Sequence, residues 1–211
     1  YSFFALYANI DGFNYSENEV LVVNRSEIDR WILSELNTLV RQVEGNYEDY
    51  EPTKVARLIQ EFVMDKLSNW HVRLSRRRFW KGEYNTDKIS AYQTLFECLE
   101  KISIISAPIA PFFMDRLFQD LNTISKKHSI TSVHLANFPK ADNNIIDVDL
   151  ERKMHLAQNI TSLALSLRKK EMIRVRQPLQ KIMIPVLNPK MQRDIEDVSR
   201  IVLSEINVKE I

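Results

Sequence analysis

The sequence predicts a mainly α protein in which a helical bundle is followed by a small α+β module. Its 211 residues include only 3 glycines and 7 prolines, which disfavours collagen-like, linker-rich and turn-rich β architectures. Apolar residues recur at helical spacing through long stretches that contain neither glycine nor proline. Short runs typical of β-strands are concentrated in the last third of the chain.

The composition is that of an ordinary soluble globular protein, with 45% hydrophobic and 27% charged residues. No apolar run approaches the ~20 residues that a membrane span needs, and the first residues lack the charged region of a signal peptide. A single cysteine excludes an internal disulfide. We therefore expect a cytoplasmic protein without a membrane partner. We also expect it to be a monomer. Because the sequence starts without methionine inside a predicted helix, we also expect a fragment of a longer protein.

Two helices are predicted before residue 50. Residues 1–10 are apolar on most sides and stop before Gly12, which can adopt the left-handed conformation that ends a helix. Ser26 offers an N-cap hydroxyl to a second helix, with an acid three residues later. Apolar residues then recur at helical spacing until Gly45, where we expect this helix to end.

The third predicted helix is the longest. It can begin at Pro52, which suits a first helical turn, and it continues without glycine or proline to about Lys81. Gly82 is expected to end it. Thr86 can then cap a fourth helix, whose apolar positions continue to about Ser106.

The prolines within 107–111 interrupt the helical pattern, because each removes a backbone donor and disfavours helix in the preceding residue. A fifth helix can restart over 112–121. The stretch that follows has little helical periodicity and contains a short extended piece at 133–135. We place the domain boundary at 144/145, which gives a helical bundle over 1–144.

Residues 145–211 predict an α+β module that is cut short. Its pattern is helix, strand, helix, strand. The expected helices are 150–170 and 189–204, and the expected strands are 182–186 and 207–211. Pro185 suits an edge strand, because its backbone cannot donate a hydrogen bond.

The net charge of +1 conceals one strongly basic segment. No acid occurs between Asp65 and Glu83, whereas six basic residues do, which leaves a net charge of −5 on the rest of the chain. The basic residues are Lys66, Arg73, Arg76, Arg77, Arg78 and Lys81. They lie at the end of the longest predicted helix, so the chain is mildly acidic with one basic surface.

A projection of this helix at 100° per residue separates two faces. The narrow stripe that we interpret as core consists of Val63, Leu67, Trp70 and Leu74. The neighbouring face consists of Asn69, Arg73, Arg76 and Trp80. On such a face arginines can bind phosphate oxygens, an amide can read a base edge, and an indole can stack on an unpaired base.

The second face therefore predicts contact with nucleic acid. A single-stranded loop suits it better than a duplex, because a stacking tryptophan needs splayed bases. The alternative is structural: the arginines pair with acids of adjacent helices, and Trp80 is a hydrophobic plug under the Gly82 turn. The residues by themselves leave both interpretations open.

A second basic run consists of Arg168, Lys169, Lys170, Arg174 and Arg176. Cations at a helix C-terminus interact favourably with the helix dipole, which accounts for the run without any ligand. Contact with the same nucleic acid is the alternative.

No catalytic residue, metal site or cofactor site is predicted. Cys98 lies on the apolar side of a helix with nothing nearby to lower its pKa, so we interpret it as core. The four histidines have no companion ligands at metal-binding spacing. The sequence contains no glycine-rich phosphate loop, no nucleophile elbow and no outstanding carboxylate pair.

Several motifs resemble the anticodon-binding domain of isoleucyl-tRNA synthetases. They lie at 1–13, 29–34, 68–80, 107–112, 132–135 and 175–179. The runs SNWHVRLSRRRFW (68–80) and VRQPL (175–179) resemble the isoleucyl enzymes specifically. The DRWILS (29–34) and APIAPF (107–112) runs are shared with valyl enzymes and indicate only the class I subfamily. Together the motifs cover almost the whole chain in the expected order.

The resemblance implies a helical bundle that holds the anticodon stem-loop of isoleucine tRNA. The parent enzyme would ligate isoleucine to its tRNA with ATP and Mg²⁺, whereas this piece, which lacks counterparts of the catalytic and editing motifs, would be inactive and need no cofactor. By likeness to the family, the tRNA-binding residues are Asn69, Arg73, Arg76, Arg77, Trp80 and Lys81. Trp80 would stack on a loop base, the basic residues would hold phosphates, and Asn69 would lie near a base edge.

This sequence departs from the family pattern at two positions. His71 stands where a tyrosine is common, which removes a possible stacking ring, and Leu74 stands where an arginine is often seen, which suggests packing. Arg78 projects toward the core side, so we expect an intramolecular partner for it. The alternatives are a helical interaction bundle that bridges domains of the parent enzyme, and the equivalent fragment of a valyl-type synthetase.

Overall fold

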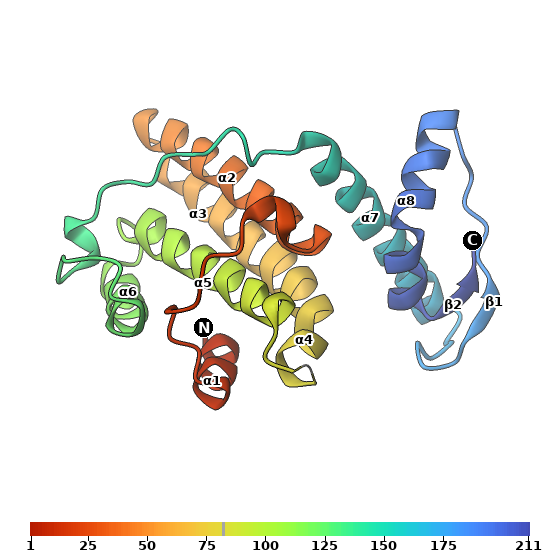
Figure 1. The fold of residues 1–211 in the computed structure, drawn as a ribbon. Coiled ribbons are helices and arrows are strands. Elements are labelled where there is room, and N and C mark those ends of the chain that lie inside the picture. The colour runs from red at the N-terminus through yellow and green to blue at the C-terminus, as the bar shows by residue number, and fades with distance from the viewer. Residues whose placement is uncertain (82) are drawn as a thin grey trace. The chain divides into compact units, whose positions relative to one another are not determined.

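A computed structural model describes residues 1–81 and 83–211, so Gly82, the expected end of the third helix, lies outside the described residues. The described chain forms two compact units, residues 1–146 and 147–211. The first unit is helical, and the second combines helices with two short strands (Figure 1). The predicted fold class, a helical bundle followed by a small α+β module, is confirmed.

The helical segments of the first unit are α1 (Ser2–Asp11), η1 (Val22–Asn24), α2 (Glu27–Glu48), α3 (Pro52–Glu61), η2 (Phe62–Val72), α4 (Arg73–Trp80), α5 (Thr86–Ser106), α6 (Pro111–Ser125) and η3 (Val133–Leu135). The segments η1 and η3 are single 3₁₀ turns, and η2 is a π-helix. The second unit contains α7 (Val148–Lys170), β1 (Leu179–Lys181), α8 (Pro189–Ile206) and β2 (Val208–Glu210).

Most predicted helix ends depend on local hydrogen bonds and are found where they were expected. Gly12 takes the left-handed conformation with φ of 70° and ends α1. The Ser26 side chain accepts a hydrogen bond from the Asp29 backbone N–H at the start of α2. Pro52 and Pro111 each lie in the first turn of their helix. These signals act within a few residues, so the sequence contains them in full.

In the first unit, three predicted helix ends and one predicted extended segment are wrong. The second helix passes through Gly45 and ends at Glu48, because one glycine costs a buried helix only about 1 kcal/mol. Asn85, rather than Thr86, caps α5 by accepting from the Lys88 backbone N–H. The fifth helix continues past 121 to Ser125. The expected extended piece at 133–135 is a 3₁₀ turn, which the Ser132 side chain caps.

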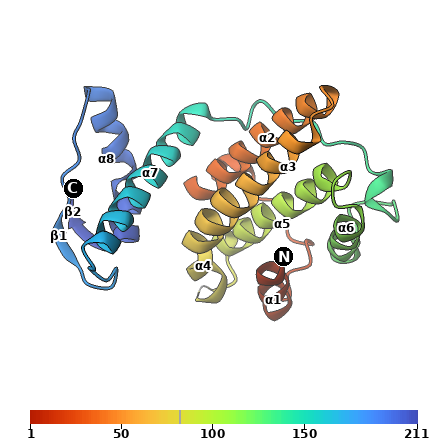
Figure 2. The ribbon, with the colours of Figure 1, turned by 180° about the vertical axis from the view of Figure 1, so that it is seen from behind.

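The longest predicted helix is present as one continuous rod, in which α3, η2 and α4 follow one another (Figures 1 and 2). The middle 11 residues are π-helical, however. Because a π-helix bonds i to i+5 and has more residues per turn than an α-helix, it changes the rotation between the two α-helical ends. The 100° projection therefore applies within α4 but not across the whole rod.

The core of the first unit lies between α2, the long rod and α5. Its largest fully buried side chains include Trp31 of α2 and Tyr92 and Phe96 of α5. Trp70 is 7% exposed and packs edge-on against Trp31, with ring centres 6.5 Å apart, which confirms its interpretation as core. The rod is thus held on the bundle by aromatic contacts along its inner side.

In the second unit α8 connects two parallel strands, and β1 pairs with β2 in the register Leu179 to Val208 and Lys181 to Glu210. The first strand lies three residues before its predicted position at 182–186. The last ladder bond is donated by the Ile182 backbone N–H to Glu210 O, beyond which β2 has ended. Within the described residues, Pro185 therefore lies in a segment without regular secondary structure or a strand partner.

No helix among the described residues is both long and apolar enough to cross a membrane.

Candidate nucleic-acid interface

The predicted RNA-binding residues lie on the exposed side of the long rod. This surface, which we call the arginine face, consists of Asn69, Arg73, Arg76, Arg77, Trp80 and Lys81. At 3.6 residues per turn, its four members within α4 span an arc of about 100°. The opposite side of α4 carries Ser75, Arg78 and Phe79, which are buried or half-buried. The helix therefore presents cations and an indole to solvent, and its anchoring residues face the bundle.

Two pairs of these residues are in contact. The Arg73 Nε donates to the Asn69 carbonyl oxygen at 2.8 Å, across the junction of η2 and α4. The Lys81 Nζ lies 5.3 Å from the centre of the Trp80 ring. Trp80 is 58% exposed, so its indole face is accessible to a stacking partner. The structural alternative, in which Trp80 is a hydrophobic plug, is wrong.

Phe79 is the plug instead. Its side chain is 1% exposed and packs edge-on against Phe3 of α1 and Tyr92 of α5, with ring centres 5.1 and 4.9 Å away. Because neighbouring helical residues point about 100° apart, burying Phe79 turns Trp80 away from the bundle. One residue thus fixes the rotation of α4 and the exposure of the next.

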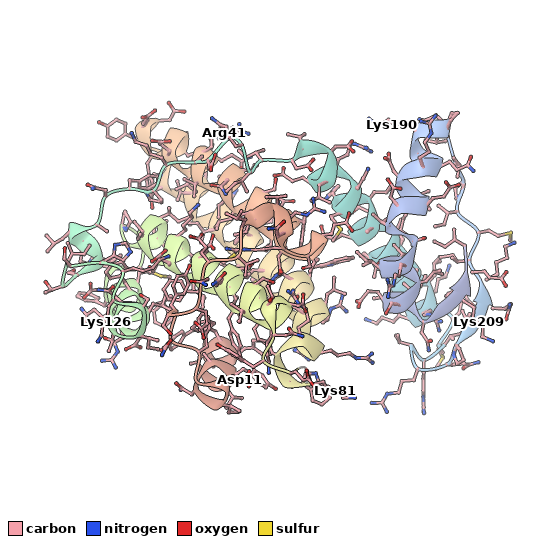
Figure 3. The ribbon with its side chains drawn as sticks, in the orientation of Figure 1. Asp11, Arg41, Lys81, Lys126, Lys190 and Lys209 are labelled. Atoms are coloured by element: carbon pink, nitrogen blue, oxygen red, sulfur yellow. The ribbon has the colours of Figure 1, made fainter. Side chains whose placement is uncertain are left out.

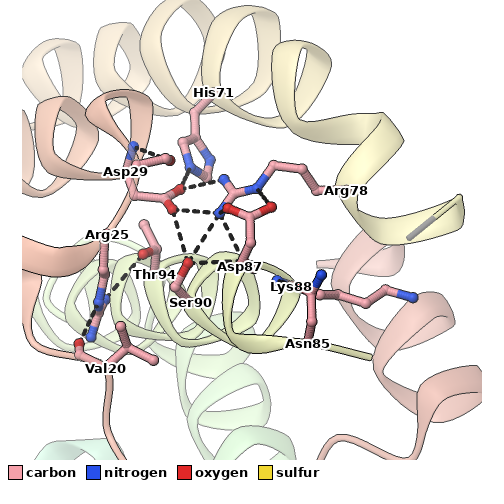
Figure 4. Close-up of polar contacts among 11 residues, drawn as sticks. Val20, Arg25, Asp29, His71, Arg78, Asn85, Asp87, Lys88, Ser90 and Thr94 are labelled. Atoms are coloured by element: carbon pink, nitrogen blue, oxygen red, sulfur yellow. Dashed lines mark hydrogen bonds and ion pairs between the residues drawn. The ribbon is translucent and has the colours of Figure 1, made fainter. Parts of the chain in front are cut away.

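Arg78 is the second anchor, as expected from its position. Its Nη1 and Nη2 donate to the two carboxylate oxygens of Asp29 on α2, at 2.9 and 2.7 Å (Figure 4). The Nε donates to Asp87 at 2.9 Å, and Nη2 also reaches Ser90 at 3.1 Å. The His71 Nε2 lies 2.9 Å from Asp29 as well. We call this network the Asp29 clamp: Asp29, His71, Arg78, Asp87 and Ser90.

The clamp joins α2, η2, α4 and α5 at a buried carboxylate. Asp29 has no exposed surface. Its burial would raise the pKa of this carboxyl, but hydrogen bonds from His71 and Arg78 outweigh burial and hold the pKa well below its ordinary value. Asp29 is therefore a buried anion, and its charge is balanced by a cation that α4 supplies.

The buried His71 shows that one sequence interpretation is wrong. The sequence comparison with the family predicts that the lack of a tyrosine at this position removes a possible stacking ring. The side chain at 71 is fully buried against α2, so a ring here does not reach the surface. Sequence reasoning also missed Asp29 as a partner, because the two residues lie 42 positions apart. Leu74, by contrast, is half-buried, as packing predicts.

Only part of the basic segment is available to a ligand. Arg78 is held by the clamp, and Lys66 forms an ion pair of 2.7 Å with Glu35 of α2. Within the described residues, Arg76 and Arg77 make no ion pair and are exposed. The structural alternative, in which the arginines pair with acids of adjacent helices, therefore holds for Arg78 and does not describe these two residues.

The second basic run is divided in the same way. Arg168 is 4% exposed and donates to backbone carbonyls, whereas Lys169, Lys170, Arg174 and Arg176 are exposed.

Cys98 is fully buried, as predicted, and burial raises the pKa of its thiol. Among the described residues, no three His, Cys, Asp or Glu side chains are grouped so as to hold a metal ion.

Curated relatives of this chain are named isoleucine–tRNA ligases. The chain is 56% identical to the Cytophaga hutchinsonii protein over 99% of its own length, and 55% identical to the Bacteroides thetaiotaomicron protein over 100%. It is 40% identical to the Clostridium tetani protein over 100% of its length. It spans only 19%, 18% and 20% of these relatives, respectively, so it corresponds to about a fifth of each.

A family model described as the anticodon-binding domain of tRNA ligase matches residues 29–183. The match begins at the buried carboxylate of the clamp and includes every residue of the arginine face. The family match covers most of the chain, and the Bacteroides thetaiotaomicron relative aligns with the whole of it. The chain therefore belongs to the family of tRNA ligase anticodon-binding domains.

Proposed function

We propose that the arginine face binds the anticodon stem-loop of isoleucine tRNA, as part of an isoleucine–tRNA ligase. One observation carries the proposal: four exposed cations and an exposed indole lie along one side of α4, in a chain of the anticodon-binding family. The names of the relatives support isoleucine tRNA as the particular ligand.

Each residue type has a chemical role in this proposal. Trp80 stacks on an unpaired base of the loop, which contributes roughly 1–3 kcal/mol. Arg73, Arg76, Arg77 and Lys81 bind phosphates, with a salt-dependent attraction. Asn69 approaches a base edge. The Asp29 clamp takes no part in binding and acts by holding α4 in place.

The parent enzyme would use ATP and Mg²⁺ to ligate isoleucine, and would be a cytoplasmic monomer. The residues that bind ATP would belong to the catalytic part of such an enzyme, whose motifs have no counterpart in this sequence. We therefore assign the chain RNA binding alone and derive no step of the ligation from it.

The proposal is tested by titrating the chain with an isoleucine anticodon stem-loop at increasing salt concentrations. Four neutralised phosphates at about −0.7 each on a single strand predict a slope of log affinity against log salt near −3. The double variant Arg76→Ala, Trp80→Ala should bind more weakly and with a shallower slope.

A matched control comes from the same unit. The double variant Arg57→Ala, Phe112→Ala also removes one exposed arginine and one exposed aromatic ring, away from α4. It should bind like the wild type. A flat salt dependence, or unchanged binding by the Arg76→Ala, Trp80→Ala variant, would contradict the proposal.

The alternative, a helical bundle that bridges domains of the parent enzyme, makes the opposite prediction. The same α4 substitutions should then lower the melting temperature and leave RNA affinity unchanged. The exposure of Arg76 and Arg77, with no ion pair in the described part of the chain, argues against it. A valyl-type fragment would instead prefer the valine stem-loop, so that RNA is the competitor to include in the titration.

A further inference from the structure

Positive charge in the second unit is concentrated between the end of α7 and β1. Residues 168–181 contain six basic residues and one acid, a net charge of +5. The remaining residues of 147–211 have a net charge of −2. The unit therefore repeats, on a smaller scale, the charge asymmetry of the first unit.

The acids that form ion pairs in this unit lie toward the N-terminal ends of its two helices. Near the start of α7, Arg152 donates to Asp194 of α8 at 2.8 Å, and Lys153 lies 2.9 Å from Asp197. These contacts join the N-terminal halves of both helices, and Arg168 near the end of α7 bonds to Asn207 at the end of α8. The two helices therefore run parallel, and their C-terminal ends lie together. Lys190, at the start of α8, and Lys209 of β2, which follows the end of α8, lie at opposite ends of the unit (Figure 3). The basic residues at the C-terminal end of α7 are thus separated from Asp194 and Asp197, whereas Glu171 and Glu205 lie at the same end as the basic residues.

Arg168 gives the turn after α7 a fixed shape. Its Nη1 donates to the carbonyl oxygens of Arg174 and Gln177, each at 3.1 Å, and its Nη2 donates to Asn207 O at 3.1 Å. The Arg168 side chain is almost fully buried. One cation of the run is therefore used to order the backbone that presents the others.

Asn207 holds the same turn from the end of α8. Its side-chain amide donates to Val175 O at 3.0 Å, and its own backbone is left-handed, with φ of 52°. The carbonyls of residues 174, 175 and 177 are thus all bonded inward. Arg174 and Arg176 are exposed and make no ion pair among the described residues.

The helix dipole accounts for only part of this run. Lys169 and Lys170 lie in the last turn of α7, where the dipole favours cations. Arg174 and Arg176 lie beyond the C-cap residue Glu171, and the dipole effect falls off within the last turn. Two arginines without acid partners on an ordered turn remain to be explained.

We propose that a second RNA contact is formed by the basic turn, which consists of Lys169, Lys170, Arg174 and Arg176. The ligand is the phosphate backbone of the same RNA, and the inference rests on the proposed function of the arginine face. Phosphate contacts from exposed arginines carry no sequence information and add affinity and position. Because Arg168 and Asn207 already order the turn, little conformational entropy is lost on binding.

The test measures binding of an isoleucine tRNA transcript to the whole chain at several salt concentrations. The double variant Arg174→Gln, Arg176→Gln removes two charges from the turn without altering its backbone bonds. At about 0.7 to 0.9 per phosphate, its salt slope should be shallower than that of the wild type by about 1.4 to 1.8. Its melting temperature should be unchanged.

Two variants are measured beside it. Lys190→Gln, Arg193→Gln removes two exposed charges from the opposite end of the unit and should keep the wild-type slope. If the Lys190→Gln, Arg193→Gln variant makes the salt slope shallower by the same amount as the turn variant, net charge alone explains the effect and the inference is overturned. Arg76→Gln, Arg77→Gln reports on the arginine face. If that variant loses affinity while the turn variant does not, the basic turn is excluded and the proposed function stands. If the wild type does not bind the transcript, both the proposed function and the inference about the basic turn are contradicted.

Discussion

Replacing Asp29 by asparagine should destabilise the first unit by about 3 kcal/mol. Asp29 is fully buried and accepts two hydrogen bonds from Arg78. Breaking a buried ion pair by removing one partner costs roughly 3–5 kcal/mol, because the other charge is left uncompensated. Arg78 keeps Asp87 and Ser90 as partners and its side chain is 15% exposed, which places the cost at the lower end of that range.

The assay is urea unfolding followed by tryptophan fluorescence. The three tryptophans, Trp31, Trp70 and Trp80, all lie in the first unit, so their emission reports its unfolding separately from the second unit. The matched control is Asp87→Asn, whose carboxylate also contacts Arg78 but is 55% exposed. An exposed partner of this kind contributes up to about 1 kcal/mol.

The pH dependence of the free energy of unfolding provides a second test of the clamp. The pKa of Asp29 is lower in the folded than in the unfolded state, so its stabilisation is present above the unfolded pKa and is lost as pH falls toward the folded pKa. The stability difference between wild type and Asp29→Asn should therefore shrink as pH falls below about 4. A cost below about 1 kcal/mol for Asp29→Asn, or equal costs for Asp29→Asn and Asp87→Asn, would refute the clamp.

Three further predictions concern single residues. Phe79→Ala should lower the free energy of unfolding by about 3–5 kcal/mol in the same fluorescence assay, because it empties a buried aromatic site. Trp80→Ala should leave the melting temperature nearly unchanged and weaken stem-loop binding by about 1–3 kcal/mol, measured by filter binding, because the ring is exposed. The thiol of Cys98 should react with an aromatic disulfide reagent only on unfolding, because it is buried and its pKa is raised; rapid labelling of the native chain would contradict this.

The features that the sequence predicts well are those that depend on neighbouring residues. The caps at Ser26 and Gly12 follow from side chains and backbone within one turn. The exposed side of α4 follows from helical periodicity, since the segment 73–80 is a regular α-helix. Composition and periodicity were therefore sufficient for the fold class and for the location of the basic surface.

The features that the sequence missed depend on distant partners. The first strand is set by its register with β2 rather than by its own apolar run, so the prediction placed it three residues late. His71 is buried because Asp29 lies across from it on α2. A count of charges could not tell that Arg78 and Arg168 are used internally while Arg76 and Arg174 are exposed.

The central claim, that Trp80 and the cations around it contact the anticodon loop, is tested most directly by acrylamide quenching of tryptophan fluorescence. Trp31 and Trp70 are 0% and 7% exposed, so the part of the emission that acrylamide quenches readily comes from Trp80. Saturating isoleucine anticodon stem-loop should protect that part, and the Trp80→Phe variant should show no such change. Quenching that is the same with and without saturating RNA would contradict the account.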